Sequence, residues 1–260
     1  MSARLIKGTW HLLLLSLLCF SSSAMALPSQ TAADVSSFKQ ANDFYRSGKF
    51  EEAAKIYQEL AEGHPTGVFY YNLGNTRFRM NQSGPAIFAY ERAMRLEPRN
   101  PDIRRNLNYV RGLLEYRIQD KRNWYVRAGE NVLEYFTVRE INLLWVMTVF
   151  FFLAVWASRL WTGREGPWGW RRKTLLALAF VFIGLAILKN IETNVMSDAI
   201  VMKGEVEVRY GPSESDQVAF RLGEGLKVYV VDRRENWKRI VLVNGESGWV
   251  SSEDIAEVRL

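Results

Sequence analysis

Two apolar runs near the middle of the chain, residues 141–160 and 174–190, constrain its fold more than any other feature. The first run has no charged residue before Arg159. At about 1.5 Å per residue, a helix of this length would cross a bilayer core of roughly 30 Å. The second run has a shorter uncharged centre, for which a buried core helix is the alternative. The sequence therefore predicts a two-helix transmembrane hairpin.

The loop between the runs, residues 161–173, combines helix-breaking glycine and proline with Arg164, Arg171, Arg172 and Lys173. Short loops rich in Lys and Arg stay in the cytoplasm. Both flanking regions are then expected on the other side of the membrane. The predicted localisation is the bacterial inner membrane, with the flanking domains in the periplasm.

The amino terminus has the features of a signal peptide over residues 1–26. Arg4 and Lys7 precede an apolar stretch, and Ala24–Ala26 supplies the small-x-small pattern of a cleavage site. We therefore expect the remaining chain to be exported. If the segment stays uncleaved, its basic end still remains inside, so the predicted topology is unchanged.

Removing this segment takes away the single cysteine and one of the two histidines, which leaves only His64. A disulfide, a thiolate nucleophile and a Cys/His zinc cluster are then excluded. We expect no enzymatic activity, no cofactor and no metal. The net charge of +6 is spread among acids without a nucleic-acid-binding motif, so no nucleic acid is expected as a partner.

An internal repeat with a spacing of 33 residues follows, between segments 40–65 and 73–98. Small, aromatic and proline residues recur at matching places: Ala41 with Gly74, Asn42 with Asn75, Tyr45 with Phe78, Ala53 with Ala86, Tyr57 with Tyr90, Leu60 with Ala93 and Pro65 with Pro98. This pattern resembles the tetratricopeptide (TPR) repeat, although Asn81 replaces the usual glycine of the turn between helices. The resemblance implies an all-α solenoid over residues 36–120, including a final capping helix.

TPR stacks usually hold an extended peptide in the groove lined by the first helix of each repeat. On that face Asn42, Asn75 and Asn108 recur every 33 residues, with Arg104 and Arg105 nearby. By resemblance, such side chains bind a peptide backbone or a terminal carboxylate. The alternative is that the asparagines only bridge adjacent helices.

Residues 121–140 mix aromatic and charged side chains, which is typical of an amphipathic segment. Such a segment would rest on the membrane beside the first predicted span, as a juxtamembrane element. The alternative is that it packs onto the last helix of the repeats.

The region 197–260 changes to short alternating strands separated by turns, with Asn244-Gly245 as a strong hairpin signal. The expected strands are 205–209, 217–220, 227–232, 237–243 and 248–252. The order of these strands and turns resembles a bacterial SH3-like domain, which implies an all-β barrel. Tyr210, Trp237 and Trp249 are candidates for an aromatic ligand surface, although both tryptophans are better suited to filling the core or pinning the last hairpin.

The complete order of segments is similar to that of the BatE-type proteins of the aerotolerance (Bat) operons. This resemblance implies partners with von Willebrand A domains and a MoxR-type ATPase, in an envelope-stress role. With two recognition modules and no plausible active site, the chain is expected to be a multidomain membrane scaffold. The alternative is a cell-wall sensor whose SH3-like domain binds peptidoglycan peptides.

Overall fold

The computed structural model describes residues 32–116, 118, 120, 122–162, 174, 177, 181, 184, 185 and 197–259. Contacts divide the chain into two units, residues 1–36 and 37–260. Several predictions fall outside the described residues: the signal peptide (1–26), nearly all of the cytoplasmic loop (161–173) and most of the second span (174–190).

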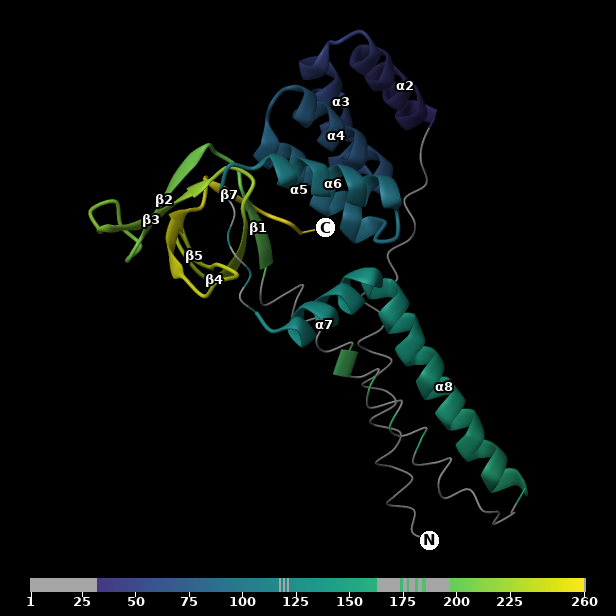
Figure 1. Cartoon of the computed structure of the whole chain (residues 1–260). Helices are drawn as coiled ribbons and strands as arrows, with labels where there is room; N and C mark the ends of the chain where they lie inside the picture. Colours follow the sequence, from purple (N-terminus) through teal and green to yellow (C-terminus); the bar gives the residue numbers. More distant parts are fainter. Residues whose placement is uncertain are drawn as a thin grey trace. The chain divides into compact units, whose positions relative to one another are not determined.

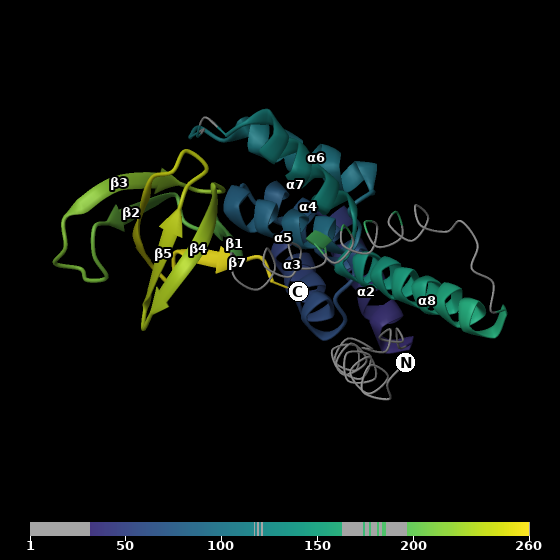
Figure 2. The same ribbon diagram turned by 90° about the horizontal axis from the view of Figure 1, so that it is seen from below.

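The first part of the described chain is helical. Its helices are α2 (Ala32–Arg46), α3 (Phe50–Gly63), α4 (Gly67–Arg79), α5 (Ser83–Leu96) and α6 (Pro101–Leu113). Helices α3 to α6 pack on one another in chain order, as Figures 1 and 2 show. Small side chains allow this close packing, because Ala41, Ala53 and Ala86 are fully buried and Gly74 lies directly against the ring of Tyr90.

The turns within the two helix pairs, α2–α3 and α4–α5, recur at the spacing of 33 residues. Gly48 ends the first inter-helix turn with φ +76°, and Asn81, 33 residues later, adopts φ +58°. Asparagine is among the few non-glycine residues that tolerate this left-handed conformation. Thr66 caps α4 by accepting from Phe69 N at 3.3 Å.

Two further helices follow, α7 (Trp124–Tyr135) and α8 (Val138–Thr162). Thr137 and Glu140 form a capping box at the start of α8: Glu140 N donates to Thr137 Oγ1 (3.2 Å), and Thr137 N donates to Glu140 Oε2 (3.0 Å). Arg99, between α5 and α6, bonds to Glu140 and lies over the ring of Tyr135. Trp124, Tyr125 and Tyr135 of α7 are all exposed, and whether this segment packs onto the last helix of the repeats stays a prediction.

The predicted transmembrane hairpin is wrong. The first run does form a helix, but no helix in the described ranges combines the length and the low polarity that crossing a bilayer requires. The described fold is a helical region followed by an antiparallel sheet. The predicted localisation, the bacterial inner membrane with the flanking domains in the periplasm, is contradicted by the same finding.

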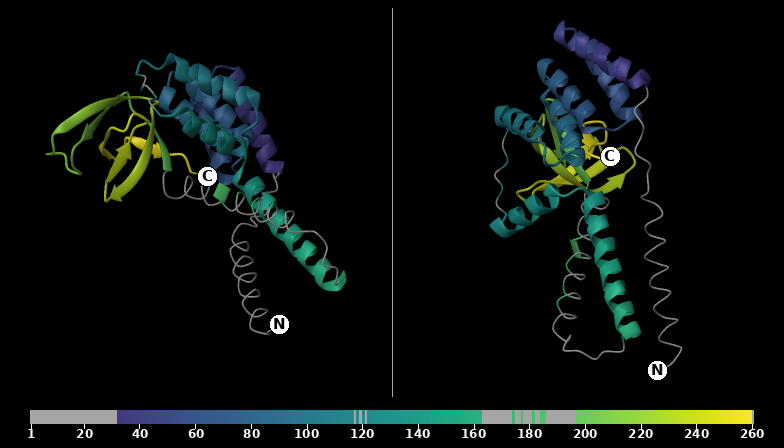
Figure 3. Two further views of the ribbon diagram at one scale, coloured as in Figure 1. Left: turned by 60° about the horizontal axis from the view of Figure 1, so that its bottom comes forward. Right: turned by 90° about the vertical axis from the view of Figure 1, so that its right-hand side faces the viewer.

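The carboxyl-terminal part is a seven-stranded antiparallel sheet in the order β3-β2-β6-β5-β4-β1-β7. Its strands are β1 (Ser197–Val201), β2 (Glu205–Arg209), β3 (Val218–Gly223), β4 (Lys227–Arg234), β5 (Trp237–Val241), β6 (Ser247–Ser251) and β7 (Ile255–Glu257). Figure 3 shows the green and yellow strands bending around a common interior. Val206, Val208, Val228, Val230 and Ile240 fill that interior and are buried.

The helices and the sheet share a second apolar core. Ile200 from β1 and Val258 pack with Ile87 and Tyr90 of α5 and with Val110 of α6, all almost fully buried. Every residue of β1 is buried, because the strand is covered by its sheet neighbours and by α5. The helical region and the sheet therefore fold against each other within residues 37–260.

The sheet also supplies the missing cap of α5. Gln82 precedes the helix without a side-chain capping bond, and Gly84 N donates instead to Glu224 Oε1 at 2.7 Å. A carboxylate at this position satisfies a free N–H group and complements the helix dipole. Glycine is needed here, because a Cβ on Gly84 would lie 2.6 Å from the carbonyl oxygen of Val201.

Ion pairs complete the contact between helices and sheet. Asp198 on β1 lies between Arg95 Nη2 of α5 (3.0 Å) and Lys227 Nζ of β4 (2.8 Å). Burial favours the neutral acid, but these two cations outweigh it and hold the pKa of Asp198 below its ordinary value. Burial also disfavours the charge on Lys227, yet the carboxylates of Glu91 and Asp198 raise its pKa above the ordinary value. Both groups are thus charged at neutral pH.

Candidate binding sites

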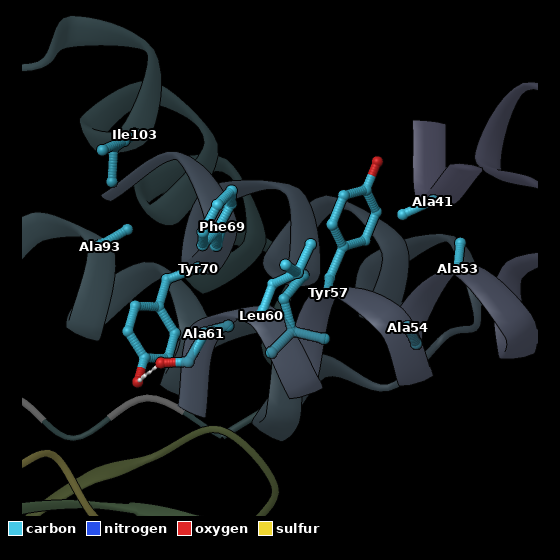
Figure 4. Close-up of a cluster of buried hydrophobic side chains, with 12 residues drawn as sticks. Ala41, Ala53, Ala54, Tyr57, Leu60, Ala61, Phe69, Tyr70, Ala93 and Ile103 are labelled. Carbon is cyan, nitrogen blue, oxygen red and sulfur yellow. Dashed lines mark hydrogen bonds between the residues drawn. The ribbon is translucent and has the colours of Figure 1, made fainter. Parts of the chain in front are cut away.

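The predicted groove asparagines make the same contact in both repeats. Tyr57 Oη donates to Asn42 Oδ1 at 2.8 Å, and Tyr90 Oη donates to Asn75 Oδ1 at 2.7 Å. Burial raises the pKa of Tyr57 to about 12 and also raises the pKa of Tyr90. Both hydroxyls therefore keep their proton at neutral pH and act as donors. Figure 4 shows the ring of Tyr57 within the helical core beside Ala41.

The asparagine that α6 contributes to this series of contacts is not the predicted one. Asn106 Nδ2 donates to Asn75 Oδ1 (2.9 Å) and to the hydroxyl of Tyr71 (3.1 Å), whereas the predicted Asn108 is exposed. Asn75 therefore bridges α4, α5 and α6. The sequence contains one indication of Asn106, because this residue directly precedes the apolar Leu107, which is buried in the fold. The spacing of 33 residues points to Asn108 instead.

The two predicted arginines lie at the start of α6 and bond locally. Arg104 Nη2 donates to the carbonyl oxygen of Pro98 at 2.8 Å. Arg105 pairs with Asp102 at 3.1 Å, and both side chains are mostly exposed. A pair of this kind contributes little to stability and leaves the cation accessible to a ligand.

The tyrosine bonds fix which end of each amide can meet a ligand. Because Oδ1 of Asn42 and Oδ1 of Asn75 accept from buried hydroxyls, their NH₂ groups point away from those hydroxyls. Within the described residues the side-chain hydrogen bonds of Asn42 and Asn75 all use Oδ1 as the acceptor, not the NH₂ group. Each amide can thus donate to a carbonyl or carboxylate oxygen. Whether these residues bind a ligand stays a prediction.

In the sheet the three predicted aromatic residues occupy different environments. Tyr210 is 70% exposed at the end of β2, and Trp237 is partly exposed at the start of β5. Trp249, in the middle of β6, is only 7% exposed, and the guanidinium of Arg234 lies 5.1 Å from its ring centre. Trp249 is paired with Arg209 and Arg239 on the adjacent strands, and Tyr210 follows Arg209 directly in the chain. Their role in ligand binding also stays a prediction.

The described ranges contain no group of three or more His, Cys, Asp or Glu side chains arranged to hold a metal ion. The strongly shifted carboxylates there have structural ion-pair partners. Glu257, for example, accepts from Arg233 at 2.8 and 3.1 Å, and its pKa falls to about 2 because of that bond. Such a carboxylate is a salt-bridge partner and not a tuned acid or base.

Comparison with known proteins adds one result to this geometry. A search of curated proteins finds no match to the chain. Residues 202–257 match the family model described as Bacterial SH3 domain, which covers β2 to β7. The SH3-like part of the sequence prediction is therefore confirmed, and a module of this family is consistent with binding to protein or to peptidoglycan.

Proposed function

We propose that the protein is a non-enzymatic adaptor, which holds partner proteins through its helical repeats and its SH3-like domain. The observation that carries the proposal is the repeated bond from a buried tyrosine hydroxyl to an asparagine amide, Tyr57 to Asn42 and Tyr90 to Asn75. It supports a TPR-type assignment of the repeats, because the same contact returns after 33 residues.

The chemistry of these amides suits an extended peptide. Two NH₂ groups with fixed orientations on α2 and α4 can donate to successive backbone carbonyl oxygens of a bound segment. Since each amide is already oriented, less conformational entropy is lost on binding than for a free side chain. Arg104 and Arg105, on the next helix of this series, add positive charge for a carboxylate of the same ligand.

The test uses a displayed library of random peptides selected against the full chain. We expect the affinity of the selected peptides to fall about fivefold for Asn42→Ala or Asn75→Ala, and by a similar factor for Tyr57→Phe. Tyr70→Phe is the matched control. It removes another hydroxyl of the core, which donates to the carbonyl of Ala61 and accepts from Arg92, and leaves the amides in place. Equal losses in all variants, or a library that yields no binder, would contradict the proposal.

A second function, binding to peptidoglycan peptides, is favoured by the family match over residues 202–257. Co-sedimentation with purified peptidoglycan tests it, with the full chain recovered in the pellet as the expected result. The full chain is required, because Ile200 of β1 is buried against α5 and would be exposed in an isolated sheet. Recovery only in the supernatant would refute this function.

The partners implied by the resemblance to BatE-type proteins, a MoxR-type ATPase and proteins with von Willebrand A domains, stay predictions. The absence of enzymatic activity also stays a prediction. A hydrolytic activity of the full chain that is lost in His64→Ala would contradict it.

A further inference from the structure

The outer face of the sheet gathers arginine side chains around one tryptophan. Val208, Val250 and Ile240 point into the sheet core, so their chain neighbours Arg209, Trp249 and Arg239 lie on the opposite face. The strand pairing brings Arg209, Trp249 and Arg239 into one row. Trp249 is paired with Arg209 on one side and with Arg239 on the other. The row crosses β2, β6 and β5.

Arginine covers the tryptophan on this face. Trp249 is only 7% exposed although it lies outside the sheet core, and the guanidinium of Arg234 from β4 lies 5.1 Å from its ring centre. The helices approach the sheet elsewhere, at β1 and at the turn that contains Glu224. A guanidinium stacked on an indole is held in place while its N–H groups remain available.

The three arginines on this face differ in how fully their charge is paired with a carboxylate. Arg209 is occupied, because it bonds to Glu207 at 2.6 Å and to the carbonyl of Asp216 at 2.7 Å. Arg234 has a loose pair with Asp232 at 3.6 Å, in which both side chains are largely exposed. Arg239 is exposed and lies opposite Asp232 of β4, but among the described residues Asp232 forms its ion pair with Arg234 and not with Arg239.

We propose that Arg234, Arg239 and Trp249 form a docking surface for an acidic segment of a partner protein. Arg239 would pair with a carboxylate through two parallel N–H donors, and Arg234 would exchange its loose contact with Asp232 for a second carboxylate. Positive groups on neighbouring strands suit carboxylates that project from one side of an extended chain. The proposal rests on the adaptor function above and assigns a ligand class to its SH3-like domain.

The experiment is a fluorescence anisotropy titration of the full chain with a labelled peptide of alternating Glu and Ser. A peptide with Gln in place of Glu is the matched probe. We expect saturable binding of the acidic peptide only, and a loss of about tenfold in Arg239→Gln or Arg234→Gln. Arg221→Gln is the control, because Arg221 is another half-exposed arginine of the same sheet, on β3, and pairs with Glu205 and Glu207.

Two results would overturn the proposal. Equal weakening by Arg221→Gln and Arg239→Gln would show that the peptide responds only to net charge. Binding of purified peptidoglycan that depends on Arg239, without binding of the acidic peptide, would assign the face to cell-wall carboxylates instead. Neither result touches the adaptor proposal, which is decided by displayed peptides and by Asn42 and Asn75.

Discussion

Substitution of Asp198 by asparagine should weaken the contact between the helices and the sheet. The side chain of Asp198 is 9% exposed and accepts from Arg95 at 3.0 Å and from Lys227 at 2.8 Å. Asparagine has nearly the same shape but no charge. The substitution therefore leaves two cations close together without the carboxylate that separates them.

The loss of unfolding free energy depends on how far Asp198, Arg95 and Lys227 are buried. Removing one partner of a fully buried ion pair costs about 3 to 5 kcal/mol. Arg95 and Lys227 are 21% and 24% exposed, so water can partly replace the lost carboxylate. We therefore expect the free energy of unfolding at pH 7 to fall by about 2 kcal/mol. Because the pKa of Asp198 is lowered in the fold, its contribution is present at neutral pH and is lost as the pH falls through and below its ordinary value of 3.8.

Urea denaturation followed by circular dichroism measures this change, and hydrogen exchange with mass spectrometry locates it. Exchange should accelerate in α5 and β1 together, since Asp198 joins the two. Asp102→Asn is the matched control, because the pair of Asp102 with Arg105 is exposed and should contribute less than about 0.5 kcal/mol. Faster exchange in β1 alone, or equal effects of the two substitutions, would refute a charge-based link between helices and sheet.

Three further predictions concern single positions. Gly84→Ala should lower the free energy of unfolding by about 1 to 3 kcal/mol in urea titrations, because the new Cβ would meet the carbonyl of Val201 at 2.6 Å. Glu257→Gln should cost about 1 kcal/mol at pH 7 after allowance for solvent screening. Since folding lowers the pKa of Glu257 from 4.5 to about 2, the difference from the wild type should fade between these pH values. Asn81→Ala should lower the thermal midpoint by an amount equivalent to about 1 kcal/mol, whereas Asn81→Gly should not, because the residue has φ +58°.

The local elements could be predicted because their signals are local. The turn residues Gly48 and Asn81 lie in the left-handed region at the expected spacing. The expected strand 205–209 is β2, and the other four expected strands overlap β3 to β6. In β2 and in the first half of β4 buried residues alternate with more exposed ones, which is the alternation that sequence analysis detects.

The strand β1 was missed for a physical reason. All five of its residues are buried, so SDAIV shows no alternation between apolar and polar positions. The polar residues at its start are explained only by distant partners: Ser197 accepts from Arg233 at 3.0 Å and Asp198 pairs with Arg95. A segment whose polar groups are satisfied from another part of the fold does not look like a strand in the sequence.

The candidate sites also depend on contacts between distant parts of the chain, which the sequence does not show. The spacing of 33 residues located Asn42 and Asn75, but the third residue in contact is Asn106, because the face that α6 turns toward α4 is decided by packing. The arginines around Trp249 come from β2, β4 and β5, and only the strand pairing brings them together. The transmembrane prediction failed differently: it was argued from the length and the lack of charge of residues 141–160, but no described helix meets the requirement for crossing a membrane.

The contacts between helices and sheet bear on function as well as on stability. Glu224 of the sheet caps α5, and α5 carries Tyr90, whose hydroxyl orients the amide of Asn75. A change that displaces the turn at Glu224 would therefore remove the cap from the helix that carries Tyr90. Coupling between two sites requires an element that both can influence. Within the described residues α5 joins the turn at Glu224 to the amide of Asn75, so a change at that turn can reach Asn75 through α5.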